Sequence, residues 1–459
     1  MFAIPGIAGL IVFILVRPQE FLPMLQKVPF LHLFAAFALV GYVIDVRLRR
    51  TQPIATPVLP WAAAYLLWAV ISTAINVPEI LISKVIEMAI LFTLYGTIAH
   101  GIQRFRAFQV VVGVLSVVCV FVAAVCLHQG MSPRQCVGGE NLDGEGVGRP
   151  DGRACEMNEQ CGGPGAEPGL TYRCELVGIG DMHSVEGRVR YRGDLQDPNE
   201  VALVIAVGGI SILAAFIQRK RSGFFRVAAT LAMAICVAAI MLTKSRGGQV
   251  AMMLVFFVYM VKRYRFKAFI PAAMMAIPLL MFGGRDDGGA SDQSTMERYE
   301  AWSKGLELFG QSPVYGVGAG QFVEHHYLTA HNSFVLSLAE LGFVGLVLFV
   351  AMLYLSIKSL LQGLIVLRDV PGSEVAQVWG MALLGSFCAT SFSISTLSFS
   401  YKAVLWILFA LVGAWTGSIR HHKPDFVVKL SWRDFLIIVV ACLAFSTVVL
   451  RLFLKFKGV

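Results

Sequence analysis

The chain has 459 residues, of which 57% are hydrophobic and only 15% are charged, and its net charge is +9. These charges are too few to cover the surface of a soluble protein, and no basic run alternates with aromatic residues as a nucleic-acid groove would require. The mean hydropathy is +0.70, and apolar runs of about 18 residues or more recur, each long enough to cross a bilayer as a helix. The sequence therefore predicts an all-α polytopic membrane protein that binds membrane lipids and no nucleic acid.

Hydropathy predicts about 12–13 transmembrane helices. The candidate segments, in chain order, are 2–16, 28–46, 58–76, 82–100, 107–128, 199–217, 224–242, 249–261, 268–282, 333–357, 376–394, 398–418 and 435–453. The first segment lacks a basic start and a small-residue cleavage site, so we expect a short membrane helix there and not a signal peptide.

The basic residues between these segments predict the orientation of the chain. Four short basic connections, and a fifth at 420–434, fall on one side when the helices are counted, and the positive-inside rule makes that side cytoplasmic. The four are 47–50, 104–106, 219–221 and 262–267. The N-terminus is then inside and the C-terminus outside, and two long loops face outward. We expect five parts: helices 1–128, a cysteine-containing loop 129–198, helices 199–282, a second loop 283–332 and helices 333–459.

Four of the nine cysteines lie in the first outer loop, at Cys136, Cys155, Cys161 and Cys174. In an oxidising compartment they predict two disulfides, with three pairings open. A zinc site is the alternative, but no C-x-x-C pair is present and the compartment disfavours it.

Cations next to a glycine pair mark one outward-facing turn, TKSRGGQ at 243–249. Lys244 and Arg246 lie there against the positive-inside rule. They are either snorkelling anchors at a helix end or, because Gly-Gly allows close approach to the backbone, part of an anion site.

The second outer loop carries Arg298 and Trp302 at i, i+4, which places both on one face of a predicted short amphipathic helix. Pro313 and the glycines 316, 318 and 320 follow. This G-x-G-x-G has no βαβ unit around it and is therefore not a dinucleotide fingerprint; it predicts a tight, mobile turn.

Histidines 325, 326 and 331 come next. With Glu324 they suggest a metal site, but adjacent histidines usually point apart, so we expect no metal. The other interpretations are solvated loop histidines, or His331 as a general base with a near-neutral pKa. Asn332 is a predicted cap of the following helix. Glu340 lies about 13 Å further along that helix, too far to pair with His331, and we expect a structural role for it with Lys244 or Arg246 as its partner.

Four motifs together resemble the O-antigen ligase and polymerase superfamily, membrane glycosyltransferases of the GT-C type. They are the SRGG turn, the R-x-x-x-W helix with its P-x-x-G-x-G-x-G turn, the HNSFVLSLAELGFVG helix entrance, and RGDLQDPNEVA at 192–202. The resemblance covers roughly residues 190–350.

This resemblance implies a GT-C-like fold in a bacterial inner membrane, with the active site facing the periplasm. Such proteins take a glycan from undecaprenyl diphosphate and transfer it to an acceptor hydroxyl without a cofactor or metal ion. Arg246 and Arg298 would bind the lipid diphosphate, and His331 would activate the hydroxyl. Lys244, Trp302, Asn332, Arg192 and Asn199 are the further candidates for substrate contact.

The acceptor is either another glycan, which makes the protein a polymerase of O-antigen, capsule or exopolysaccharide, or lipid A–core, which makes it a ligase. The DPNE motif and the long cysteine loop favour a polymerase, for which family analogy adds a chain-length regulator as partner. A protein-directed oligosaccharyltransferase is a third alternative. A transporter or flippase would place its charges at mid-membrane, and a purely structural scaffold would not gather Arg246, Arg298 and His331 on one side.

Overall fold

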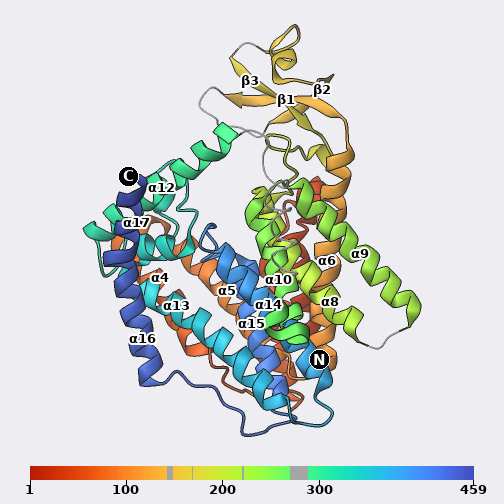
Figure 1. Ribbon diagram of the computed structural model, residues 1–459, viewed down its shortest axis with the longest axis vertical. Helices are drawn as coiled ribbons and strands as arrows, with labels where there is room; N and C mark the ends of the chain where they lie inside the picture. The colour runs from red at the N-terminus through yellow and green to blue at the C-terminus, as the bar shows by residue number, and fades with distance from the viewer. Residues whose placement is uncertain (142–147, 168, 220–221, 269–287) are drawn as a thin grey trace.

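A computed structural model describes residues 1–141, 148–167, 169–219, 222–268 and 288–459. It is a bundle of helices with one small sheet (Figure 1). The N-terminal half contains α1 (Ala3–Leu15), α2 (Pro18–Phe21), α3 (Phe30–Arg47), α4 (Leu59–Asn76), α5 (Leu81–Gly101), α6 (Phe105–Met131), α7 (Pro198–Val204), a π-helical turn (Ile205–Ile210), α8 (Ser211–Gln218) and α9 (Gly223–Leu242). The C-terminal half contains α10 (Arg246–Tyr264), α12 (Gly288–Gln311), α13 (Ser333–Leu367), α14 (Glu374–Ser393), α15 (Ala403–Ile419), α16 (Trp432–Ala444), a second π-helical turn (Phe445–Val449) and α17 (Leu450–Lys457).

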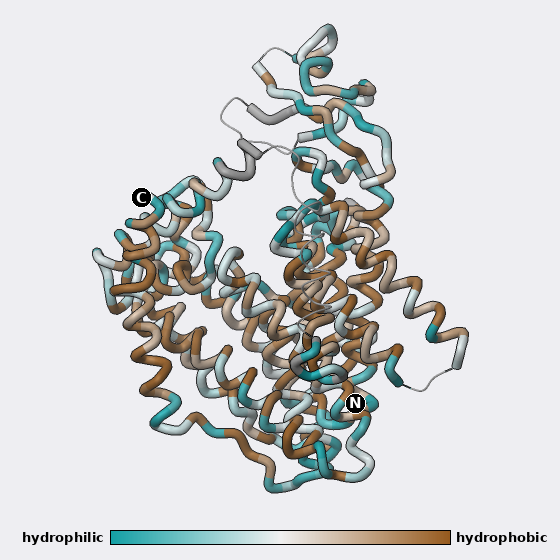
Figure 2. The backbone as a smooth tube through the Cα atoms, viewed as in Figure 1, coloured by the Kyte–Doolittle hydropathy of each residue, from teal (hydrophilic) through white to brown (hydrophobic). Residues whose placement is uncertain are grey.

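The predicted all-α membrane architecture is confirmed. Within the described residues, nine helices are long and apolar enough to cross a membrane, and α1 and α15 are shorter apolar helices. Twelve of the predicted segments are helical, and the thirteenth, 268–282, lies outside the described residues except for Ala268. Figure 2 shows hydrophobic residues along the bundle and hydrophilic ones at its connections and in the sheet.

Burial separates central helices from peripheral ones. The apolar window of Pro198–Gln218 is 83% buried and that of Ser333–Leu367 is 72% buried, whereas those of α3, α9 and Trp432–Lys457 are only 22% buried. An apolar helix with so much exposed surface needs an apolar surround. The chain is therefore a multi-pass membrane protein, with α7–α8 and α13 at its centre and α3, α9 and α16–α17 at its rim.

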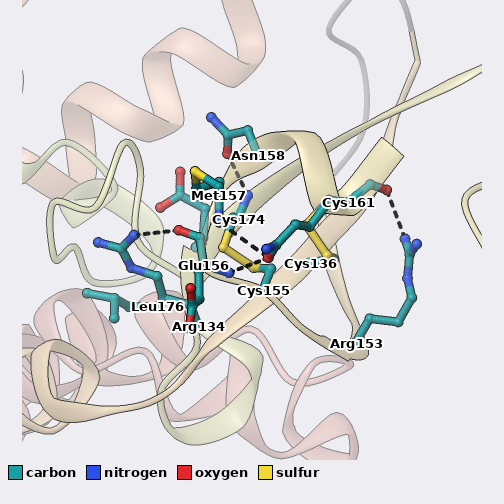
Figure 3. The surroundings of a disulfide bond; sticks show 12 residues. Arg134, Cys136, Arg153, Cys155, Glu156, Met157, Asn158, Cys161, Cys174 and Leu176 are labelled. Carbon is teal, nitrogen blue, oxygen red and sulfur yellow. Dashed lines mark hydrogen bonds between the residues drawn. A yellow bond between two sulfur atoms is a disulfide. The ribbon is translucent and has the colours of Figure 1, made fainter. Parts of the chain in front are cut away.

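The first long loop, which the sequence predicts to face outward, forms a sheet that the sequence did not predict. Its strands β1 (Arg134–Asn141), β2 (Arg149–Ala154) and β3 (Leu170–Leu176) are antiparallel in the order β2-β1-β3. The structure pairs Cys136 with Cys161 and Cys155 with Cys174 (Figure 3), one of the three open pairings. The four cysteines pack with Tyr172 as the small core of this part of the chain, which we call the disulfide module (described residues within 133–190). Figure 1 shows it at the opposite end of the molecule from the N-terminus.

A break interrupts α13 at Gly342, whose φ of 66° and ψ of −166° are not helical. The carbonyls released by the break accept hydrogen bonds from the preceding loop: Val317 N donates to Ala339 O and Gly318 N to Glu340 O, both at 3.0 Å. From α4, Trp68 Nε1 donates to Leu341 O at 2.9 Å and Ser72 Oγ to Glu340 O at 3.0 Å. A broken membrane helix needs such partners, because lipid offers none.

The break gives one expected result. Gly342→Ala would place a Cβ against the carbonyl of Val314, in a backbone conformation that L side chains rarely adopt. We expect a loss of about 1–3 kcal/mol of stability from the backbone alone, measured as a lower melting temperature in detergent. Gly417→Ala in α15 is the matched control, since a Cβ there meets open space. Equal melting temperatures for the two variants would contradict the described packing at Gly342.

Candidate functional site

Two neighbouring cavities contain most of the residues that the sequence singled out. The first, which we call the arginine cavity, has a volume of about 220 Å³. Its lining is Asn199, Arg246, Gly247, Gly248, Val250, Arg298, Phe392, Ser393, Thr396 and Leu397. The second, the histidine cavity, has a volume of about 390 Å³. Its lining is Val185, Glu186, Arg188, Arg190, Gln196, Asp197, Pro198, Asn199, Ser294, Glu297, Arg298, Leu328 and His331. Asn199 and Arg298 line both, so the two cavities adjoin.

The SRGG turn forms one wall of the arginine cavity. Ser245 caps α10, because its Oγ accepts the Gly248 N–H at 3.0 Å. A Cβ at Gly248 would overlap Ala202 of α7, whereas a Cβ at Gly247 would meet only ordinary contacts, Ser245 Oγ at 3.9 Å and Thr396 Oγ1 at 4.0 Å. Helix packing therefore requires the second glycine, and the first leaves the helix start accessible. The N-terminus of a helix attracts anions through its unpaired N–H groups and its dipole, and Arg246 adds a full charge there.

Asn199 joins three segments at the boundary of the cavities. Its Oδ1 accepts from Ser245 Oγ at 2.7 Å and from Arg188 Nη2 at 3.0 Å, while its Nδ2 donates to Asp197 Oδ1 at 2.8 Å. Arg188 also donates from Nε to the Thr243 carbonyl at 3.0 Å. Hydrogen bonds to this one side chain therefore connect the DPNE motif, the SRGG turn and the end of the disulfide module.

His331 lines the histidine cavity immediately before α13, with a left-handed φ of 44°. Such a conformation is uncommon for a residue other than glycine. Burial lowers the pKa of His331 below its ordinary value, and the Arg298 guanidinium lowers it further, against the opposing influence of Asp197 and Glu297. The imidazole is consequently neutral near pH 7 and able to accept a proton.

The residue after it, Asn332, caps α13, as predicted: its Oδ1 accepts from Phe334 N at 2.9 Å and Val335 N at 3.2 Å. Ser333 Oγ donates to the Leu397 carbonyl at 2.7 Å, which fixes the helix start against the segment that lines the arginine cavity. Asn332 is itself 5% exposed. The structure gives it the role of holding His331 at the cavity.

Four predicted contact residues are not in the lining of either cavity: Asn332, described above, and three others. Arg192 donates to the Glu20 carbonyl at 2.8 Å and its guanidinium lies over the Phe21 ring. Trp302 packs against Tyr299 and against Phe453 of α17. Lys244 occupies the turn before α10 with a φ of 48°. Their positions fit packing and turn formation.

The predicted partner of Glu340 is wrong. Its carboxylate, 2% exposed, accepts the backbone N–H groups of Gly320 at 2.9 Å and Phe322 at 3.0 Å, not a side chain of the SRGG turn. The glycine turn approaches α13 so closely that a Cβ at Gly316 would overlap the Glu340 carbonyl. The turn that the sequence predicted to be mobile is thus anchored at the break in α13 by contacts with Glu340.

The histidines that precede His331 lie apart from it. His326 stacks on Tyr327 and hydrogen-bonds within its own turn, with Nδ1 3.1 Å from both Leu328 N and O. Among the described residues, the one group of three potential metal ligands within reach of each other is Cys136, Cys155 and Cys161. These cysteines are joined in disulfides here.

Sequence reasoning missed five charged residues of the histidine cavity: Arg188, Arg190, Glu186, Asp197 and Glu297. Arg190 donates to the His183 carbonyl at 3.0 Å and contacts His183 Nε2 at 2.6 Å. The alternating arginines of RVRYR (188–192) were a signal for the first two, because alternation in an extended segment directs every second side chain to the same face.

The fold and these cavities define a multi-pass α-helical membrane protein with a site where the SRGG turn, α12 and the start of α13 bring Arg246, Arg298 and His331 together. Residues 231–350 match the family model described as O-antigen ligase, so this part of the chain is similar to that family. The matched stretch contains Arg246, Arg298, His331 and Glu340; RGDLQDPNEVA lies outside it. No curated protein matches the sequence.

Proposed function

We propose that this protein is a glycosyltransferase that polymerises polysaccharide repeat units carried on undecaprenyl diphosphate, at the periplasmic face of a bacterial inner membrane. The observation that carries the proposal is the convergence of Arg246, Arg298 and His331, from three separate parts of the chain, on two cavities that adjoin at Arg298 and Asn199.

The donor diphosphate belongs in the arginine cavity. Guanidinium groups bind phosphate oxygens in pairs and keep their charge in any surrounding, and the N-terminus of α10 adds the backbone N–H group of Gly247. The apolar side of the same cavity, formed by Val250, Phe392 and Leu397, suits the first units of a lipid chain.

The transfer step follows from this arrangement. An acceptor hydroxyl oxygen attacks the anomeric carbon of the donor glycan, and the bond from that carbon to the diphosphate oxygen breaks. His331 takes the hydroxyl proton, and undecaprenyl diphosphate leaves with the bonding electrons. Arg246 and Arg298 stabilise the negative charge that grows on the leaving group, so the step needs no metal ion in this proposal.

A ligase that transfers the glycan to lipid A–core would use the same donor and residues. The histidine cavity favours polymerisation, because Val185 and Glu186 of the disulfide module add a wall to it beside the DPNE motif and α12. A chain-length regulator is the partner that a polymerase would need.

The test uses the purified full-length protein in detergent with lipid-linked repeat units extracted from the producing cells. Successive elongation, seen as a ladder of glycan lengths on a gel, is the expected result. A single joining event that requires added lipid A–core would replace the polymerase with the ligase. Donor that stays intact with either acceptor would overturn the transferase proposal.

A further inference from the structure

We propose that Arg188 is a positioning residue for the donor diphosphate, and that it acts on the arginine cavity through Asn199 although it lines only the histidine cavity. This inference rests on the proposed function, which places the diphosphate beside Arg246 and Arg298. It adds a residue outside 231–350, the stretch that matches the family model, and a coupling between the two cavities.

Arg188 joins the two ends of the turn that precedes α10. The residue is 6% exposed. Its Nε donates to the Thr243 carbonyl at 3.0 Å, and its Nη2 donates at 3.0 Å to Asn199 Oδ1, which also accepts the Ser245 hydroxyl at 2.7 Å. Between these ends, Lys244 has a left-handed φ of 48°. Such a conformation persists in a residue other than glycine only where the surroundings hold it, and Arg188 holds this turn at both ends.

The amide of Asn199 is held in one orientation by groups of opposite charge. Arg188, whose guanidinium has N–H donors and no acceptor, lies at Oδ1, while Asp197 Oδ1 accepts from Asn199 Nδ2 at 2.8 Å. A reversed amide would place its NH2 group against the guanidinium and its oxygen against the carboxylate. Arg188 and Asp197 therefore decide which atom of Asn199 faces the Ser245 hydroxyl.

The orientation of this amide decides in turn what the Ser245 hydroxyl can do. Because Oδ1 faces it, the hydroxyl donates to Asn199, and its oxygen accepts the N–H of Gly248 at 3.0 Å as the cap of α10. Arg246 is the first residue of that helix and lines the arginine cavity. The contacts therefore run from Arg188 through Asn199 and Ser245 to the backbone that carries Arg246.

The backbone on the C-terminal side of Arg188 is fixed to two membrane helices. Val189 N donates to the Leu242 carbonyl at the end of α9, at 3.3 Å. Arg190 N donates to Gln129 Oε1 near the end of α6, at 2.9 Å. The guanidinium is therefore presented to Asn199 from a defined place, as a positioning residue requires.

The two contacts of Arg188 also separate positioning from charge. A guanidinium is a planar fork with five N–H donors, so Nε and Nη2 reach acceptors on two segments at once. A lysine keeps the positive charge but has a single nitrogen at the end of its side chain. Arg188→Lys therefore preserves the attraction between this charge and an anion and removes the simultaneous hold on Thr243 and Asn199.

Donor binding is measured first, with undecaprenyl diphosphate as the probe and the full-length protein in detergent. We expect Arg188→Lys to weaken binding about tenfold, the size of one lost hydrogen bond to a charged group. Arg153→Lys is the matched control, because Arg153 donates to Asp151 at 2.7 Å and to the Cys161 carbonyl at 3.2 Å within the disulfide module, outside both cavities. The control should bind the probe as wild type does.

A double-mutant cycle shows whether Arg188 acts through Asn199. Once Asn199→Ala has removed the amide, Arg188→Lys has nothing further to misplace, so the double variant should bind the probe within about twofold of Asn199→Ala alone. Losses that multiply in the double variant would overturn the inference, because the guanidinium would then act by another route. Wild-type affinity in Arg188→Lys would overturn it as well, because the charge alone would suffice.

In the transfer assay, Arg188→Lys should raise the KM for the lipid-linked donor and leave the KM for the acceptor unchanged. A change confined to the acceptor KM would contradict the inference, since it would assign Arg188 to the cavity that it lines. If the cycle shows the expected coupling but no transfer occurs with any acceptor, Arg188 remains a positioning residue of a diphosphate site and the transferase proposal fails. If wild type does not bind undecaprenyl diphosphate, the donor assignment and this inference fail together.

Discussion

His331→Ala is expected to lower the rate of glycan transfer by about 10²–10⁴-fold, the usual contribution of a positioned general base. The variant should keep its affinity for the lipid-linked donor, since Arg246 and Arg298 remain. Single-turnover transfer under saturating donor, compared with equilibrium binding of the donor, separates the two effects. His326→Ala is the matched control, because that imidazole is bonded within its own turn.

The pH dependence of the transfer rate also tests the assignment of His331 as the general base. A base acts in its neutral form, so the rate falls as pH drops through the pKa of His331. Burial and Arg298 hold that pKa below its ordinary value, near 6.5 for an unperturbed histidine, so wild type should retain activity into mildly acidic solution. Arg298→Gln removes one cause of the lowering, and the acid limb of the profile should move to higher pH.

Two outcomes would contradict this assignment. An active His331→Ala with an unchanged acid limb would mean that another group accepts the proton. An acid limb that moves to lower pH in Arg298→Gln would mean that the guanidinium does not act on the imidazole.

Arg246→Ala and Arg298→Ala are each expected to reduce transfer by about 10²–10³-fold, the cost of removing one donor that stabilises charge in the transition state. The lysine variants keep the charge but lose the paired geometry, so they should recover only part of the rate. Rates and donor KM for both residues, measured with the same lipid-linked donor, test this. Arg106→Lys, on an exposed position outside both cavities, serves as control.

The comparison of alanine and lysine variants also distinguishes two roles for Arg246. If it only anchors a helix end, lysine should replace it fully, because either side chain can snorkel. Full activity in Arg246→Lys would therefore return this residue to the anchoring interpretation and leave Arg298 as the cation of the site.

Most of the helical fold was accessible from the sequence, because a bilayer requires long apolar runs and these are visible without a structure. The sheet of the disulfide module was not. Its strands, such as RQCVGGEN and RPDGRA, lack the apolar alternation that marks a strand resting on a core, since their core consists of disulfides. Cysteine spacing predicted the bonds, but pairing depends on the distances that the folded strands create.

Some residues of the candidate site could likewise be predicted from the sequence, and others could not. Arg246, Arg298 and His331 were visible because each lies in a local motif, and the cap by Asn332 is a local rule as well. The partner of Glu340 was not visible, because the break at Gly342 brings a distant turn to its carboxylate. Arg188 and Glu297 were missed because only the folded chain brings the end of the disulfide module against α12.

The break in α13 also bears on the order in which the chain is made. The groups that satisfy its carbonyls, on α4 and in the loop at 315–318, all precede α13 in the sequence. Domains are synthesised from the N-terminus, so a ribosome delivers these donors before the helix that depends on them. When α13 leaves the translocon, the donors for its released carbonyls have therefore already been synthesised. A circular permutation that began the chain at α13 would remove this advantage.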